Sequence, residues 1–172
     1  MKRASLVSGL VLLLAAQGPL PAIEVPQTRQ EFVSAVTAGR GATIRETFVI
    51  ERDIDEVYKT IERRSSPCLD VEVRRSGFVG GQMEVSSSDY NPTLRRVGRN
   101  SAEFALQVVH RPRGVGASPP PGGLYVMAAD LRSLGKGRTE VVLYRSKIGF
   151  KKIYSSFTQW ASGEDESCPK MR

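Results

Sequence analysis

The sequence predicts an α+β fold, in which a curved antiparallel sheet of about six to seven strands wraps around a C-terminal amphipathic helix. Three features of the chain predict it: a strand that leads into an amphipathic helix, a period of two over residues 69–147, and a strong helical stripe after that. The length of 172 residues, with 40% apolar and 25% charged residues, is typical of one globular domain. These values exclude a disordered chain, a collagen and a long repeat array.

The N-terminus has the pattern of a secretory signal peptide over residues 1–22. Lys2 and Arg3 precede an apolar run at 6–16 that is too short to span a bilayer, and small or helix-breaking residues follow it. We expect cleavage after Ala22, which lowers the net charge from +7 to +5. The alternative is that this segment folds as a buried N-terminal helix. The pattern predicts an exported protein, periplasmic in a Gram-negative cell and secreted otherwise, with no transmembrane segment in the mature chain.

Residues 23–41 are predicted to form a short helical segment ahead of a single α+β domain at 42–172. Thr28 with Glu31 three residues later is a capping box, which places the helix at about 28–38. This segment carries only a narrow apolar stripe, so we expect it to be peripheral to the main core.

The domain opens with a strand followed by a helix. Alternate apolar residues predict a strand that ends at Ile50, and Asp53 is placed to cap the helix behind it. The helix carries apolar residues at helical spacing, namely Ile54, Val57, Tyr58 and Ile61. Pro67 is expected to limit this helix at its C-terminal end.

Six further strands are predicted in the segment with a period of two. They are expected at 69–75, 81–87, 94–98, 102–110, 124–132 and 139–147. Phe104, Leu106 and Val108 share one face of their strand, and Tyr125 and Met127 are placed on one face of the next strand. The stretch at 90–99 contains a proline and three arginines, and an open loop is the alternative there.

The last helix has the strongest stripe in the chain. Its apolar residues are Phe150, Ile153, Tyr154, Phe157, Trp160 and Ala161, and Gly163 is placed to end it. This element order, together with the passage Thr47-Phe48-Val49-Ile50-Glu51-Arg52-Asp53-Ile54-Asp55-Glu56-Val57-Tyr58, resembles the helix-grip superfamily, which includes START lipid-transfer domains and polyketide cyclase-like proteins. The resemblance covers roughly residues 43–163.

The resemblance implies a cavity between the sheet and the C-terminal helix that binds an apolar molecule and that some family members use catalytically. The residues expected to line such a cavity are Phe104, Leu106, Tyr125, Met127, Phe150, Tyr154 and Phe157. The signal peptide, the short helix at 28–38 and the cysteine pair depart from most members of the superfamily.

The two cysteines are predicted to form a disulfide, because export exposes them to an oxidising compartment. A bridge between Cys68 and Cys168 closes a loop of about one hundred residues, for which the chain-entropy model gives on the order of 4–5 kcal/mol. Two free, buried thiols are the alternative. The bridge would fasten the tail behind the last helix to the body of the domain.

The inventory of reactive side chains limits catalysis. His110 is the sole histidine, so a triad or a cysteine–histidine site has only one candidate base, and a structural role is its simplest reading. One histidine and two bridged cysteines cannot supply a zinc site, so we expect no metal and no cofactor. The other groups that an enzyme could use in the predicted cavity are Tyr125, Tyr144 and Glu84.

The positive charge points to an anionic partner. Export separates the protein from nucleic acid, so lipid headgroups, cell-wall polymers or an acidic protein are the expected partners. The basic residues outside the N-terminus include Arg74, Arg75, Arg95, Arg96, Arg99, Arg111, Arg113, Lys151 and Lys152. Because adjacent residues on a strand face opposite sides, a single patch and a scattered solvated surface both remain open.

Three functions follow from these features, in order of preference. The first is an exported, non-enzymatic protein that binds an apolar or anionic amphiphilic ligand in the cell envelope. The second is an envelope protein–protein interaction module, which is favoured if the predicted cavity is filled to normal packing density. The third is a cyclase- or hydrolase-like enzyme, which requires a titratable group inside the cavity.

Overall fold

The computed structural model describes residues 25–111, 119–164 and 167–171, and the predicted signal peptide at 1–22 lies outside them. The elements are α1 (Arg29–Thr37), β1 (Thr43–Ile50), α2 (Ile54–Leu69), β2 (Glu72–Val79), β3 (Gln82–Gly98), β4 (Ser101–Arg111), β5 (Leu124–Gly135), β6 (Arg138–Ser146) and α3 (Lys151–Ser162). The fold is therefore α+β, as predicted, and ends in a helix.

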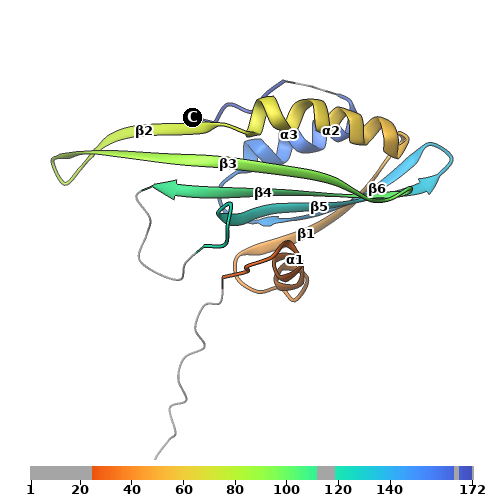
Figure 1. Ribbon diagram of the computed structural model, residues 1–172, viewed down its shortest axis with the longest axis horizontal. Helices are drawn as coiled ribbons and strands as arrows, with labels where there is room; N and C mark the ends of the chain where they lie inside the picture. Colours follow the sequence, from red (N-terminus) through yellow and green to blue (C-terminus); the bar gives the residue numbers. More distant parts are fainter. Residues whose placement is uncertain (1–24, 112–118, 165–166, 172) are drawn as a thin grey trace, which may run out of the picture.

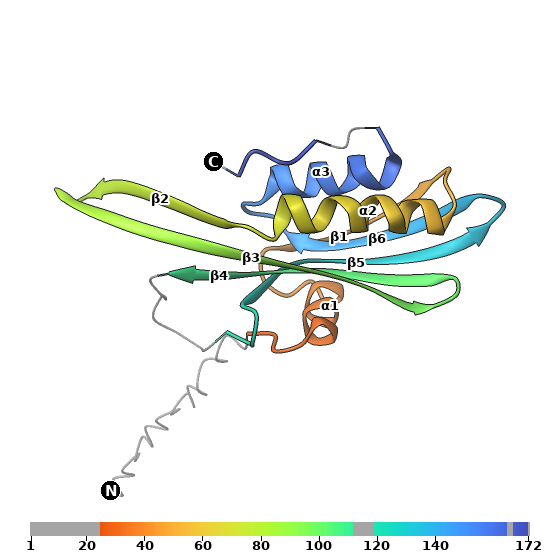
Figure 2. The same cartoon turned by 45° about the horizontal axis from the view of Figure 1, so that its top comes forward.

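The six strands form one antiparallel sheet in the order β1-β6-β5-β4-β3-β2. Helices α2 and α3 lie side by side on one face of the sheet, and α1 lies on the other (Figures 1 and 2). The sheet is open, with β1 and β2 as its edges. The hairpin of β2 and β3 projects beyond the helices at one end (Figure 2).

The helix face carries the main core. Phe104, Leu106 and Val108 of β4 share this face, as predicted, and pack with Val57 and Phe157 of the two helices. At the centre of the core, Phe104 and Phe157 place their ring centroids 4.9 Å apart. Each of these five side chains is at most 1% exposed, so the middle of the space between sheet and helices is filled.

The opposite face carries a smaller cluster under α1. Phe32 and Val36 of α1 pack on Ala128 and Val142 of the sheet. The helix begins as predicted, because the Thr28 side chain accepts a hydrogen bond of 3.1 Å from the Glu31 amide. This second layer explains why β4 and β5 bury residues on both faces instead of alternating between core and solvent.

Two of the predicted strands are one strand. The segments at 81–87 and 94–98 both belong to the 17-residue β3, so neither the break nor the alternative of an open loop at 90–99 is correct. Pro92 is tolerated because β2 begins opposite Asp89, so the proline lies where β3 has lost its neighbour on that side. The prediction for α2 was also short, since the helix includes Pro67 in its last turn and ends at Leu69.

The predicted face of Tyr125 is wrong, because a β-bulge lies between Tyr125 and Met127. The register of β4 against β5 shifts after Leu106, which pairs with Met127, while the next residue Gln107 pairs with Tyr125. The extra residue reverses the alternation, so Tyr125 lies on the α1 face and stacks on Phe32 at 6.0 Å. Tyr125 is therefore separated from Met127 by the sheet.

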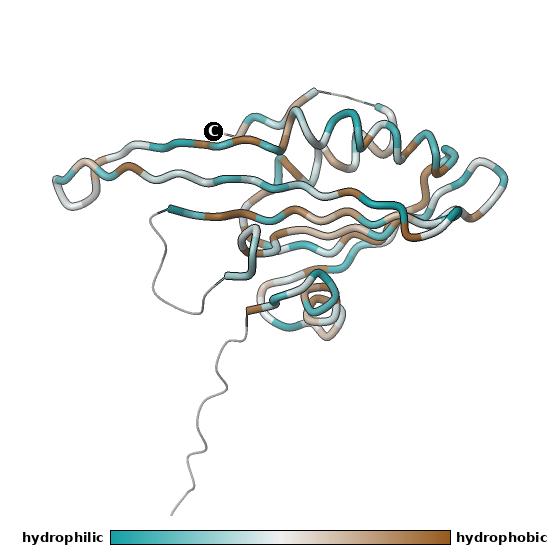
Figure 3. Tube along the Cα trace, in the orientation of Figure 1, coloured by the Kyte–Doolittle hydropathy of each residue, from teal (hydrophilic) through white to brown (hydrophobic). Residues whose placement is uncertain are grey.

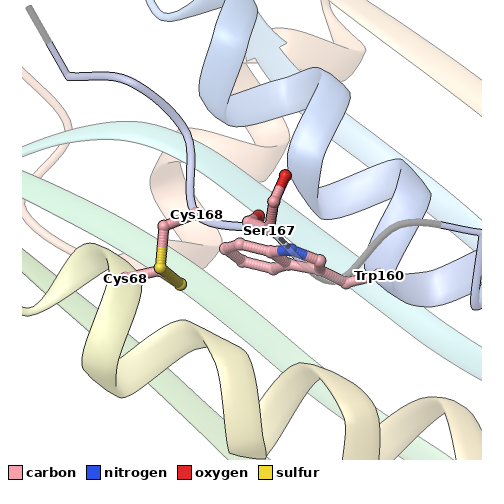
Figure 4. Close-up of a disulfide and its surroundings, with 4 residues drawn as sticks. All are labelled: Cys68, Trp160, Ser167 and Cys168. Carbon is pink, nitrogen blue, oxygen red and sulfur yellow. Dashed lines mark hydrogen bonds between the residues drawn. A yellow bond between two sulfur atoms is a disulfide. The ribbon is translucent and has the colours of Figure 1, made fainter.

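The C-terminal tail returns across the helix layer to the end of α2. Cys168 and Cys68 lie at disulfide distance, with their Cα atoms 5.1 Å apart and a separation of 100 positions in sequence (Figure 4). In the same stretch, the Ser167 carbonyl accepts a hydrogen bond of 3.0 Å from the indole nitrogen of Trp160. The tail is thus fixed to both helices, which matches the predicted cysteine pairing.

Candidate functional site

A pocket of about 950 Å³ opens on the helix face of the sheet, between β-strands, the first turn of α3 and the C-terminal tail. Its volume falls within the range of small-molecule sites. The sequence creates it where β6 ends at Ser146 and the chain turns sharply into α3. Lys170 and Met171 close one side, because the cysteine pair brings the tail back to this place.

The turn into α3 places Phe150 at the pocket. Gly149 and Phe150 both have left-handed backbones, with φ of 74° and 52°. For a residue other than glycine this conformation costs roughly 1–2 kcal/mol, and such residues cluster at functional sites. The Phe150 ring contacts Tyr90 edge-on and also lies beside Tyr154, with centroids 6.3 Å apart in each pair.

The apolar part of the pocket is made of side chains that also belong to the core. These are Tyr90, Leu143, Ile153 and Tyr154, which are at most 6% exposed, together with the partly buried Phe150 and Met171. The hydroxyl of Tyr154 donates a hydrogen bond of 3.1 Å to the Val126 carbonyl, and burial raises its pKa to about 12. Burial also raises the pKa of Tyr90. Both phenols are therefore uncharged at neutral pH.

One ion pair forms part of the wall. Arg145 binds both carboxylate oxygens of Glu46, through Nε at 2.8 Å and Nη2 at 2.7 Å. Its guanidinium also lies over the ring of Tyr154, 5.1 Å from the centroid. The hydrogen bonds that Arg145 donates to Glu46 raise the pKa of Arg145, so this side chain is a fixed positive charge held in place by its partner.

Positive charge dominates the pocket. The cationic side chains that line it are Arg75, Arg145, Lys147, Lys151, Lys152 and Lys170. Among the described residues, Glu46 is the one carboxylate in the lining. Because like charges converge on a partly apolar surface, the pocket attracts anions and favours one that also has an apolar portion.

The basic residues noted in the sequence divide between two roles. Arg75, Lys151 and Lys152 gather at the pocket. Other members of the set make ion pairs elsewhere: Arg74 with Glu72, Arg95 with Glu103, Arg96 with Asp55 and Arg111 with Asp89. Arg113 lies outside the described residues. The cations of the pocket come from distant parts of the chain. Only the pairing of the strands and the return of the C-terminal tail bring them together.

His110 lies at the rim of the pocket rather than in the core. Its Nδ1 atom is 2.9 Å from the Ser88 hydroxyl on the neighbouring strand, and the two residues are directly paired. A hydroxyl hydrogen-bonded to an imidazole is the nucleophile–base part of a triad. Within the described part of the chain, no carboxylate is found hydrogen-bonded to the ring of His110.

The seven residues predicted to line a cavity are found in three places. Phe150 and Tyr154 line the pocket. Phe104, Leu106, Met127 and Phe157 are fully buried in the main core and Tyr125 lies on the α1 face. The space between the sheet and the middle of α3 is therefore filled, and the pocket that supports ligand binding lies instead at one end of that helix.

The other groups considered for an enzyme are not at the pocket. Tyr144 belongs to the cluster under α1, where its hydroxyl donates to Asp130 at 3.1 Å. Glu84 is exposed on the projecting hairpin. Sequence reasoning missed Tyr90, Arg145 and the tail residue Met171, because each reaches the pocket only through strand pairing or through the cysteine pair.

The described residues contain no helix long and apolar enough to cross a membrane, and no group of three metal-ligating side chains that could hold an ion. A scan against models of protein families finds no match to this chain, and a search of curated proteins finds no relative. The geometry of the pocket is therefore the feature that indicates a function.

Proposed function

We propose that this protein binds an anionic amphiphile in the pocket at the N-terminal end of α3. The observation that carries the proposal is the combination of six cationic side chains with a buried aromatic and aliphatic surface in one pocket of about 950 Å³. An acidic headgroup would lie among the lysines, and its apolar chain would lie against Phe150 and Tyr154.

The charges of the pocket support an anion over a neutral ligand. Lys147 and Lys151 are exposed side chains at its mouth, whereas Arg145 is held at the wall by Glu46. Exposed lysines can turn toward a bound anion, and a fixed arginine needs no reorganisation to contribute. A headgroup with a carboxylate or a phosphate fits this arrangement.

The proposal also covers the cellular location of the protein and its fold family. We propose an exported protein of the envelope, which is supported by the N-terminal sequence pattern and by two cysteines at disulfide distance. We also propose that the fold is a member of the helix-grip type. The supporting features are an antiparallel sheet with a C-terminal helix on one face and a partly apolar pocket beside that helix.

Calorimetric titration with lauric acid below its micelle concentration tests the proposal, with methyl laurate as the uncharged comparison. We expect lauric acid to bind more tightly than its ester. The double variant Lys147→Gln, Lys151→Gln is expected to weaken the binding of lauric acid by about tenfold or more and to leave the binding of the ester unchanged. Lys59→Gln, on the exposed side of α2, is the matched control and is expected to change neither.

A second variant tests the apolar part of the site. Phe150→Ala is expected to weaken the binding of the acid and of the ester by similar factors, because the acyl chain of each ligand loses the same contact. If wild-type protein binds neither compound, the amphiphile is the wrong ligand class, and the protein–protein interaction module becomes the better proposal. Equal binding of the acid and the ester would leave an apolar pocket and remove the role of charge.

The Ser88–His110 pair supports a hydrolase as the second candidate. The Ser88 oxygen would attack an ester carbonyl while the His110 imidazole accepts its proton, and the nearby cations would stabilise the oxyanion. The ester C–O bond would then break as the imidazolium returns the proton to the leaving alcohol, and water would hydrolyse the acyl-Ser88 by the same steps. Incubation with 4-nitrophenyl laurate tests this candidate. Turnover that disappears in Ser88→Ala and His110→Gln would favour the enzyme, and equal turnover in these variants and wild type would exclude it.

A further inference from the structure

The free end of the β2–β3 hairpin exposes large apolar side chains. Phe78 is 76% exposed, Met83 66% and Val85 63%, and the first two rank among the most exposed large apolar residues of the described chain. Phe78 pairs directly with Met83, and Val85 pairs with Ser76 two positions further along the ladder. Paired residues share a face of an antiparallel ribbon, so all three apolar side chains lie on one face.

The polarity of this face changes in order along the hairpin. Phe78 and Met83 form the outermost pair, Ser76 and Val85 the next, and Arg74 with Ser87 the one after that. Arg74 is itself bound to Glu72 through two hydrogen bonds of 3.0 Å. The face thus passes from apolar to polar to charged, and Figure 3 shows the apolar colouring near the free end of β2 and β3. This sequence of polarities matches the passage from the acyl region to the headgroups of a bilayer.

Basic residues at the base of the same hairpin form a collar of positive charge. A second pocket of about 700 Å³ is lined there by Arg74, Lys152 and Lys170 and by Glu72, which is bound to Arg74. The larger pocket adds Arg75 and Lys151. These cations lie behind the apolar end, at the level where lipid phosphates would lie if the tip entered a membrane. An apolar tip with a cationic collar is complementary to an anionic bilayer, whereas it is not complementary to a second copy of this basic chain.

The hairpin and the pocket lie at the same end of the molecule. Figure 2 shows the hairpin projecting past the first turn of α3, where the pocket lies. The strands that form the base of the hairpin also contribute Arg75 and Tyr90 to the pocket. A membrane that receives the hairpin tip would therefore face the end of the molecule where an amphiphile could enter.

We propose that the β2–β3 hairpin docks the protein onto anionic lipid bilayers by inserting Phe78 and Met83 among the acyl chains. The insertion is shallow, because the apolar side chains of this face lie only in its two outermost pairs, Phe78–Met83 and Ser76–Val85. Binding of lipid surfaces by the hairpin does not depend on an occupied pocket, since its apolar face lies on the side of the sheet opposite the pocket. Membrane docking by the hairpin is a property beyond the proposed ligand site, and it would bring that site to the membrane surface.

Co-sedimentation with vesicles tests the inference on protein purified from the cells that make it, after its N-terminus has been identified by mass spectrometry. Vesicles of phosphatidylglycerol and phosphatidylcholine in equal parts are compared with vesicles of phosphatidylcholine alone. We expect stronger binding to the anionic vesicles, which weakens as salt rises. Phe78→Ser with Met83→Ser is expected to lower the partition coefficient for anionic vesicles by about tenfold or more, because two large side chains lose their transfer into the acyl region.

The matched control is Leu134→Ser, which removes another exposed apolar side chain at the opposite end of the sheet. It is expected to bind vesicles as wild type does. Phe78→Trp supplies a positional readout, because Trp160 is fully buried and its emission stays constant. The new indole is expected to shift to the blue on adding anionic vesicles and to be quenched by lipids spin-labelled on the acyl chain.

Failure of this inference is distinct from failure of the proposed ligand site. Phe150→Ala is expected to bind lauric acid more weakly and to bind vesicles as wild type does. The double hairpin variant is expected to bind lauric acid as wild type does and to bind vesicles more weakly. Vesicle binding that is equal in wild type and the double hairpin variant would overturn the inference. A wild-type dimer in sedimentation velocity that dissociates in the double hairpin variant, without vesicle binding by either, would make a second copy of the chain the partner instead.

Discussion

The two ends of α3 lie on the same sheet but in opposite environments. At the C-terminal end, Phe157 and Trp160 are fully buried, and the tail contacts the indole. At the N-terminal end, Phe150 is partly exposed and two lysines follow it. One amphipathic stripe can therefore supply a packed core along most of its length and a ligand surface at its first turn, where cationic side chains replace further apolar ones.

Phe157→Ala tests the packed end and is expected to have the largest effect. We expect it to lower the free energy of unfolding by about 3–5 kcal/mol, because lost burial is compounded by a cavity beside Phe104. Urea unfolding followed by Trp160 fluorescence measures the change. The matched variant Phe150→Ala, at the open end, is expected to cost clearly less. Equal costs would mean that the two ends are packed alike.

Cys168→Ser tests how much the open end depends on the tail. We expect the free energy of unfolding to fall by about 2–4 kcal/mol, since the cross-link constrains a long loop in the unfolded chain. We also expect weaker binding of lauric acid, because Lys170 and Met171 reach the pocket through this tail. Mass spectrometry after thiol alkylation without reductant is the control, and two alkylated thiols in unreduced wild-type protein would contradict the predicted bridge.

The backbone of Phe150 gives a smaller and more specific effect. Its left-handed conformation strains any side chain, whereas glycine adopts it freely. We therefore expect Phe150→Gly to be more stable than Phe150→Ala by about 1 kcal/mol, although both remove the same aromatic contacts. Thermal unfolding of the two variants at one pH measures the difference. The reverse order would show that the turn into α3 is not strained at this residue.

Tyr154 provides a difference that depends on pH. Burial raises its pKa to about 12 from the value of 10.0 expected in the unfolded chain. The folded chain keeps a proton that the unfolded chain loses, so this contribution to stability is fully present below pH 10 and is lost as the pH rises toward 12.

Tyr154→Phe should remove that part of the alkaline decline. At pH 7 it is expected to cost about 1 kcal/mol, because the hydrogen bond to the Val126 carbonyl is lost. Urea unfolding of wild type and variant from pH 8 to 11 measures both effects. Parallel curves over this range would show that Tyr154 titrates alike in the folded and unfolded chains.

The element types and most of the core of this protein were determined by local sequence pattern. The alternation at 102–110 and the stripe after Phe150 were sufficient, because burial on one face imposes a fixed spacing on apolar residues. The cap at Thr28 was predictable for the same reason, since its chemistry involves only the next three residues. The candidate cysteine pair followed from composition and the predicted export alone.

Tertiary structure decided what no local pattern contains. The bulge after Leu106 moved Tyr125 to the other face, and the loss of the β2 partner beyond Asp89 allowed a proline inside β3. The pocket was likewise decided by tertiary structure, because its cations come from β2, β6, α3 and the tail. Such a site depends on the register of the strands and on the return of the C-terminal tail, which bring together residues far apart in the sequence. The spacing of residues along the sequence does not contain these contacts.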